Sequence, residues 1–172
     1  FAFERIYFRE HPAVQASGWI NTNVSPGVHI LTDNHWDEGF PDLYKYKMEQ
    51  LPMYESDSEQ KVGDLVSRLA EADYILSYSN RVYGSIPRVP EEYPVSSNYY
   101  NRLFSGDLGY RLEKSFTTYP RFLGVAFVND TFRRPGLPVP EGMDRNHLAP
   151  LTFRLGYADE NVVNYDHPLV LL

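Results

Sequence analysis

Three side chains that could bind a metal ion or exchange protons alternate in the segment from Asp33 to Pro41, whose sequence is DNHWDEGFP. Side chains two residues apart in an extended segment point to the same side, so Asp33, His35 and Asp37 would face one way. Two carboxylates beside an imidazole fit a metal site or an acid–base pair. The same groups could equally bind a polar ligand or their own backbone. Three ligands are too few for a closed metal site, so we expect no intrinsic metal.

A second polar segment, from Asn80 to Arg88, has the sequence NRVYGSIPR. Arg81 and Arg88 are the candidate contacts for an anion, because a guanidinium matches a phosphate or carboxylate with two parallel hydrogen bonds. Tyr83 could line the same site. The alternative is a rigid surface loop in which the arginines pair with acidic side chains. The acidic partners available in the sequence are Asp33, Asp37 and Asp166.

Aromatic and histidine side chains near the polar segments also have both a ligand-binding and a structural interpretation. Trp36 and Phe40 flank the first polar group and could stack on a sugar ring, or could equally be core residues. Asp166 and His167 could approach the same site, although a histidine before a proline at the start of a strand also fits a structural role. The candidate ligand-binding residues are thus Asp33, His35, Trp36, Asp37, Arg81, Tyr83, Arg88, Asp166 and His167.

An apolar segment typical of a buried strand precedes each polar segment: Val28–Thr32 comes before the first and Tyr74–Tyr78 before the second. A helix is predicted before each strand, beginning near Pro12 and at a capping box formed by Ser56 and Glu59. This order predicts an α/β layered domain with a partly parallel sheet and helices packed on it, Rossmann-like but without a dinucleotide motif. We expect Tyr74–Tyr78 to be the central strand.

Parallel neighbours deliver their following loops to the same edge of a sheet, which is where ligands bind in open α/β folds. The two polar segments are therefore expected to lie together.

The remaining predicted elements are an edge strand in Tyr44–Met53, a helix capped by Ser96 or Ser97 and ended by Gly106 or Gly109, a strand in Tyr110–Phe116 with Phe122–Val128 as its neighbour, a long Pro-rich loop over 132–151, and a last strand at Leu169–Leu172.

Composition excludes several classes of function. A chain of 172 residues fits one domain, and its net charge of -7 without a basic cluster argues against nucleic acid and disfavours a peripheral binder of anionic membranes. The absence of cysteine excludes disulfides and thiol chemistry. No glycine-rich phosphate loop or nucleophile elbow occurs, so we expect neither a cofactor nor a complete catalytic set. No apolar run reaches the ~18 residues of a membrane span.

Several motifs together carry a resemblance. They are ASGWINTNVSPGVHILTDNHWDEGFP at Ala16–Pro41, ADYILSYSNRVYGSIPRVPEEYP at Ala72–Pro94, YNRLFSGDLG at Tyr100–Gly109 and YDHPLVLL at Tyr165–Leu172. The chain resembles the soluble C-terminal domain of bacterial polytopic glycosyltransferases of the protein mannosyltransferase and aminoarabinose transferase kind, which take a sugar from a polyprenyl-phosphate carrier. The chain begins with Phe1 and stops within an apolar run, so we expect a single domain excised from a longer protein.

The resemblance implies a non-catalytic module on the extracytoplasmic face of the cell membrane. In such enzymes the catalytic acidic residues lie on loops between membrane helices, so no residue here inherits that role. The implied partners are the transmembrane portion of the same polypeptide and a glycan, a lipid-linked sugar or an acceptor. Two alternatives from other classes stay open: a glycoside hydrolase that uses Asp33 and Asp37, and a stand-alone carbohydrate-binding module.

Overall fold

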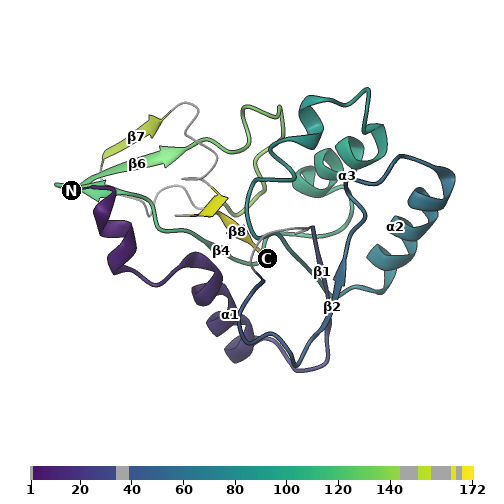
Figure 1. Ribbon diagram of the computed structural model, residues 1–172, viewed down its shortest axis with the longest axis horizontal. Coiled ribbons are helices and arrows are strands. Elements are labelled where there is room, and N and C mark those ends of the chain that lie inside the picture. Colours follow the sequence, from purple (N-terminus) through teal and green to yellow (C-terminus); the bar gives the residue numbers. More distant parts are fainter. Residues whose placement is uncertain (1, 34–38, 144–150, 156–163, 166–167) are drawn as a thin grey trace.

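The computed structural model describes residues 2–33, 39–143, 151–155, 164–165 and 168–172. Figure 1 shows the arrangement of its helices and strands. The helical elements are the short 3₁₀ helices η1 (Glu4–Phe8) and η2 (Ile86–Arg88) and the α-helices α1 (Pro12–Asn23), α2 (Glu59–Glu71) and α3 (Pro94–Ser105). The strands are β1 (His29–Thr32), β2 (Lys47–Gln50), β3 (Tyr74–Leu76), β4 (Ser115–Phe116), β5 (Arg121–Phe122), β6 (Val125–Asn129), β7 (Leu151–Leu155) and β8 (Val170–Leu171).

A three-stranded parallel sheet with the order β2-β1-β3 forms the centre of the fold. The predicted α/β layered class with a partly parallel sheet is therefore confirmed, and β2 is the predicted edge strand. The predicted centre is corrected: β1, and not β3, is the middle strand of the three. The β1 residues Ile30 and Leu31 are fully buried, which is expected of a strand covered on both faces.

The strands distribute alternate residues between two hydrophobic cores, because successive side chains point to opposite faces of a sheet. Leu31 and Ile75 face the core that contains α2 and α3 residues, whereas Ile30 and Leu76 face the core that contains Ala16 of α1. The last strand is divided in the same way. Leu169 and Leu171 lie in the first core, and Val170 and Leu172 lie in the second.

The later strands pair differently from the sequence prediction. β4 pairs with β8 in antiparallel fashion, and β8 reaches the central sheet through a bridge between Ser77 and Leu171. The apolar stretch Phe122–Val128 is therefore not the neighbour of β4. It contributes to β5 and β6, which form a hairpin with a two-residue turn, and β6 also pairs with β7 in parallel. This second sheet lies beside the N-terminus, at the end of the molecule away from α2 (Figure 1).

Two helix starts differ from the predicted caps. The N-cap of α2 is Ser58, whose hydroxyl accepts a hydrogen bond from the Lys61 amide, and not Ser56. α3 begins at Pro94, a residue suited to the first helical turn. Ser96 and Ser97 therefore lie inside α3, where their hydroxyls donate to the backbone carbonyls of other segments. The predicted stop is correct, since Gly106 caps α3 with a φ of 86°.

The Pro-rich segment has no helix or strand between Asp130 and Met143, as predicted, but Leu151 already begins β7. Residues 144–150 lie outside the described part, as do the apolar positions 162–163 near the end of the chain. No helix within the described ranges is both long and apolar enough to span a bilayer.

A buried lysine fixes α2 against the start of α3. The side chain of Lys61 is 1% exposed, and its ammonium donates to the carbonyls of Met53 and Glu55 and to Oδ1 of Asp57 at 2.6 Å. The second oxygen of Asp57 accepts a 2.6 Å hydrogen bond from the Val95 amide in the first turn of α3. Asp57 therefore neutralises a buried charge and caps a helix at once.

We expect Asp57→Ala to lower the free energy of unfolding by about 3 kcal/mol, because it leaves the Lys61 ammonium buried without its counter-ion. Urea denaturation measures the change. The control is Asp64→Ala, which removes the more exposed Asp64–Arg68 pair of α2 and should cost less than about 1 kcal/mol. Equal losses in the two variants would contradict the assigned role of Asp57.

Candidate functional site

The carboxyl ends of β1 and β3 lie side by side. Thr32 pairs with Leu76 in the parallel register, so Asp33 and Ser77 are the first residues after the paired strands. The strands that precede the two polar segments therefore end side by side, whereas the expectation that the segments themselves lie together stays a prediction. Most of the first segment, residues 34–38, lies outside the described part of the chain.

Asp33 is a buried carboxylate at this edge. It is 1% exposed, and its Oδ2 accepts hydrogen bonds from the Ser77 hydroxyl at 3.0 Å and from the Tyr100 hydroxyl at 2.9 Å. Removing a carboxylate from water is costly unless donors replace the lost hydration. These two donors come from the end of β3 and from α3, so Asp33 joins three elements.

Burial keeps the donor Tyr100 protonated. The side chain has no exposed surface, and burial, followed by the nearby Asp33 charge, raises the pKa of its phenol well above the ordinary tyrosine value. A neutral phenol donates its proton to the carboxylate throughout the physiological range of pH. The arrangement suits a fixed structural carboxylate and does not present Asp33 to solvent.

Tyr83 lies in the hydrophobic core, which corrects the expectation that it lines a polar cleft. It is 0% exposed, stacks on Phe132 with ring centroids 5.5 Å apart, and meets Phe104 edge-on at 5.2 Å. The tight turn that contains Tyr83 needs a glycine at the next position, since a Cβ on Gly84 would lie 2.3 Å from the Asn80 carbonyl oxygen. The middle of the second polar segment is therefore turned inward.

The two arginines of the second polar segment have different surroundings. Arg81 donates from Nη1 to the Tyr165 hydroxyl at 2.8 Å, and its guanidinium carbon lies 5.4 Å from the centroid of that ring. Arg88, at the end of η2, is exposed, and its side chain has no ion pair among the residues that the structure describes. Arg81 thus braces a distant segment, whereas Arg88 remains accessible to an anionic ligand.

Five predicted residues lie outside the described part of the chain: His35, Trp36, Asp37, Asp166 and His167. Their expected approach to Arg81 and Asp33 stays a prediction. Phe40, the other aromatic candidate, packs edge-on against Tyr78 at 5.2 Å and lies against the α1 core. Among the described residues, no group of three or more histidine or acidic side chains could hold a metal ion.

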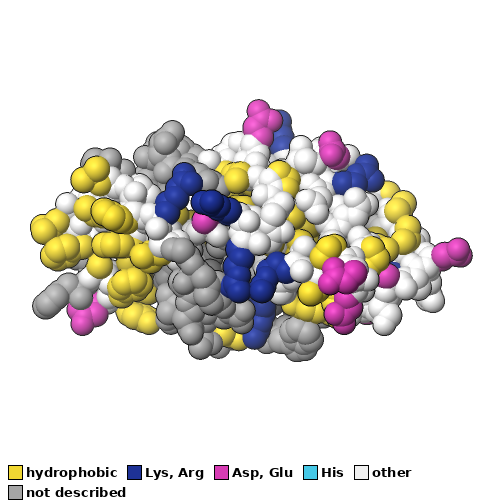
Figure 2. All heavy atoms as spheres, turned by 90° about the horizontal axis from the view of Figure 1, so that it is seen from above, with side chains coloured by type: hydrophobic (Ala, Val, Ile, Leu, Met, Phe, Trp, Pro, Cys, Tyr) yellow, Lys and Arg dark blue, Asp and Glu magenta, His cyan; other side chains and the backbone are white. Residues whose placement is uncertain are grey.

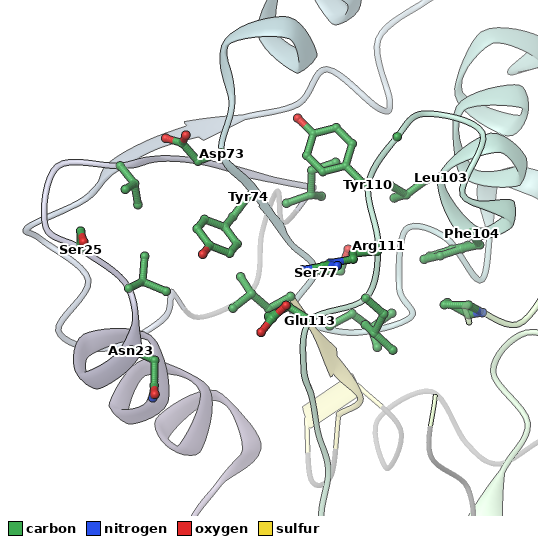
Figure 3. A pocket seen from close by; sticks show the side chains of 18 residues that line it. Asn23, Ser25, Asp73, Tyr74, Ser77, Leu103, Phe104, Tyr110, Arg111 and Glu113 are labelled. Atoms are coloured by element: carbon green, nitrogen blue, oxygen red, sulfur yellow. The ribbon is translucent and has the colours of Figure 1, made fainter. Parts of the chain in front are cut away.

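A pocket of about 500 Å³ opens elsewhere, between the end of α1, the start of β3 and the segment 109–113 (Figure 3). Asp73, Tyr74, Tyr110 and Glu113 contribute polar groups to its wall. The Tyr110 hydroxyl already donates to the carbonyls of Leu69 and Ala72, and the Asp73 carboxylate accepts from the His29 amide. The polar side chains of the pocket that could bind a ligand are therefore mainly those of Tyr74, Arg111 and Glu113.

Sequence reasoning missed Ser77, Tyr100 and Tyr165 as members of the carboxyl edge. The contact of Tyr100 with Asp33 joins positions far apart in the sequence, so no local pattern predicts it. The available signal was that Ser77 is a polar residue inside the apolar segment Tyr74–Tyr78. The pocket lies beside the start of β3, away from both polar segments, so the predicted site gave no signal for it.

We expect Tyr100→Phe to lower the free energy of unfolding by about 2 kcal/mol, since it withdraws one donor from a buried carboxylate. Tyr99→Phe is the matched control in the same helix. Tyr99 is also buried, but its hydroxyl has no hydrogen-bond partner among the residues that the structure describes, so its removal should cost less than about 0.5 kcal/mol. Urea denaturation compares the two variants, and a control loss as large as that of Tyr100→Phe would refute the proposed clamp.

Stability should also fall in alkali. Burial raises the pKa of Tyr83, Tyr99 and Tyr100, so these phenols stay protonated in the folded chain and ionise in the unfolded chain near pH ~10. The stabilisation is complete below that pH and is lost as the pH rises further. Urea denaturation between pH ~8 and pH ~11 measures it. Ionisation of all three phenols near pH ~10 in the folded chain, followed by ultraviolet absorbance, would contradict this expectation.

Comparison of the chain with protein-family models, curated protein sequences and solved structures found no match, so the resemblance stays a prediction and the function is argued from the chain's own residues.

Proposed function

We propose that the chain is a non-catalytic, extracytoplasmic module of a membrane-embedded glycosyltransferase that uses a lipid-linked sugar. In this role it packs over the membrane active site of the same polypeptide and contributes Arg88, with the first polar segment, to contacts with an anionic carrier or acceptor. The proposal gives the module a supporting function, and the transfer reaction belongs to the membrane portion.

The observation that carries the proposal is the convergence of the motifs on which the resemblance rests. Asp33 comes from the first motif, Ser77 from the second and Tyr100 from the third, and the three side chains form one hydrogen-bonded group. Arg81 of the second motif binds Tyr165 of the last motif. Sequence features that are dispersed along the chain are thus concentrated at one edge of the sheet, as expected of a shared site or of a framework that supports one.

The burial of Asp33 disfavours the glycoside hydrolase alternative. A hydrolytic carboxylate must reach the sugar or a water molecule beside it. Asp33 is 1% exposed, and two protein donors occupy its Oδ2. Asp33 is therefore better suited to hold the edge together than to act on a substrate.

The pocket beside β3 favours a second candidate, a carbohydrate-binding module. Tyrosine rings and carboxylates are the groups that sugar-binding sites use for stacking and for hydrogen bonds to hydroxyls. Tyr74 and Glu113 provide both kinds of group in one wall of the pocket. Chemical-shift changes of the pocket residues on addition of simple sugars, lost in Glu113→Gln, would favour this candidate over the transferase module.

We expect the 172-residue chain alone to transfer no sugar and to hydrolyse no glycoside. In the complete membrane protein, Arg88→Ala should lower transfer from a polyprenyl-phosphate sugar at least about tenfold, because an exposed guanidinium contact to an anion is lost. The melting temperature of the chain should not change. Arg102→Ala, which removes an exposed arginine on α3, is the control and should leave both quantities unchanged.

Three results would count against the proposal. The first is a complete polypeptide without membrane-spanning segments. The second is normal transfer by the Arg88→Ala enzyme. The third is glycoside hydrolysis by the chain alone that disappears in Asp33→Asn, which would return the hydrolase to first place.

A further inference from the structure

The end of the molecule that holds η1 and the β5-β6-β7 sheet exposes a group of large apolar side chains. Figure 2 shows them gathered at the left end of the view, in yellow. We call this surface the apolar end face, and its members are Phe3, Tyr7, Phe8, Phe122, Leu123, Leu151 and Phe153, which are 45% to 87% exposed. None of them belongs to either hydrophobic core. A contiguous apolar surface of this kind marks a contact with another phase or molecule.

Ring contacts join two members of the apolar end face, Phe3 and Phe153, through Phe127. Phe127 of β6 stacks on Phe3 beside η1 with a centroid distance of 6.5 Å, and on Phe153 of β7 at 6.2 Å. The 3₁₀ helix and the sheet are therefore coupled through a row of three phenylalanines. Side chains that project beyond this row, such as Phe8 at 87% exposure, gain little from the fold itself.

Leu123 at the tip of the β5–β6 hairpin has a backbone conformation that is unfavourable for leucine. Leu123 and Gly124 form the two-residue turn, and both have positive φ angles, 46° and 80°. Hairpin turns of this kind favour asparagine followed by glycine, and a bulky residue at positive φ is strained. Leu123 is nevertheless 84% exposed and gains almost no burial in return. A residue that is unfavourable for the fold at an exposed tip points to a contact made outside the fold.

The charge of this end differs from that of the whole chain. The described side chains of residues 2–10, 120–129 and 151–155 carry a net charge of +1, although the chain as a whole carries -7. These charged side chains are Arg9, Arg121 and Arg154 with Glu4 and Glu10. The overall acidity that disfavours an anionic membrane partner is thus located elsewhere, and the sign of the charge at this end suits anionic headgroups.

We propose that the apolar end face docks on the surface of a lipid bilayer, with Leu123 and Phe8 entering the headgroup region. Exposed aromatic side chains with interspersed arginines are the composition of membrane-interface surfaces. A second copy of the chain is a poorer occupant, because two such ends would bring charges of the same sign together. The inference deepens the proposed function, since it specifies which end of the module rests against the membrane.

The test is flotation of the 172-residue chain with vesicles of phosphatidylcholine and phosphatidylglycerol. Binding should be stronger than to vesicles of phosphatidylcholine alone. Leu123→Asn should lower the partition coefficient about tenfold, because it removes one inserted leucine. Asparagine suits a positive φ, so the same variant should melt at an equal or a higher temperature. Opposite changes in binding and stability exclude unfolding as the cause.

Val66→Asn provides the matched control, since Val66 is an apolar residue of α2 that is 62% exposed and lies outside the apolar end face. It should leave vesicle binding unchanged. Absence of binding, binding that Leu123→Asn does not weaken, or an equal loss in Val66→Asn would each overturn the inference. So would a vesicle-free dimer that Leu123→Asn dissociates. None of these outcomes requires sugar transfer, so failure here leaves the proposed transferase module standing, and failure of the Arg88 experiment leaves membrane docking standing.

Discussion

The structure depends on the hydrogen bonds that stabilise one buried charge, the carboxylate of Asp33. Asp33 follows the middle strand of the central sheet, and its carboxylate is 1% exposed. Ser77 and Tyr100 supply donors from β3 and α3, so the same hydrogen bonds that compensate the charge also fix a strand and a helix against β1. A buried carboxylate satisfied by directional donors tolerates few alternative arrangements, whereas apolar packing tolerates many. The carboxyl edge of the sheet is for this reason a rigid platform from which the two polar segments extend.

The predictable part of the fold was the part encoded by local periodicity. The apolar segments of β1 and β3, the stripe of α2 and the glycine after α3 are patterns within a few residues, and they placed the parallel sheet correctly. The roles of Ser77 and Tyr100 could not be found in this way, because each depends on a contact with a residue 44 or 67 positions away. The sequence did not predict β7, because four of its five residues are exposed and the strand therefore lacks an alternation of buried and exposed positions. The burial of Tyr83 was not predicted either, because a tyrosine in a polar segment can lie on the surface or in the core.

Three separate regions of the surface present different chemical groups. The end of η2 offers an accessible guanidinium at Arg88, the pocket beside β3 offers tyrosine and carboxylate groups, and the apolar end face offers aromatic side chains with a positive local charge. Average composition conceals this division: a net charge of -7 describes none of the three regions. A surface with regions of different chemistry suits a protein that contacts more than one kind of neighbour at once.

The position of β8 has a consequence for how the chain acquires its fold during synthesis. Residues 169–172 supply side chains to both hydrophobic cores, and Leu171 pairs with Ser77, 94 positions earlier. Until residues 169–172 are synthesised, both cores are therefore incomplete and one side of β3 lacks its partner. Exposed strand edges and unfilled cores invite wrong pairing, so the nascent chain has to be shielded until these residues emerge. Completion of both cores thus requires a short strand to enter between segments that are already made, and its long sequence separation makes that step slow compared with helix formation.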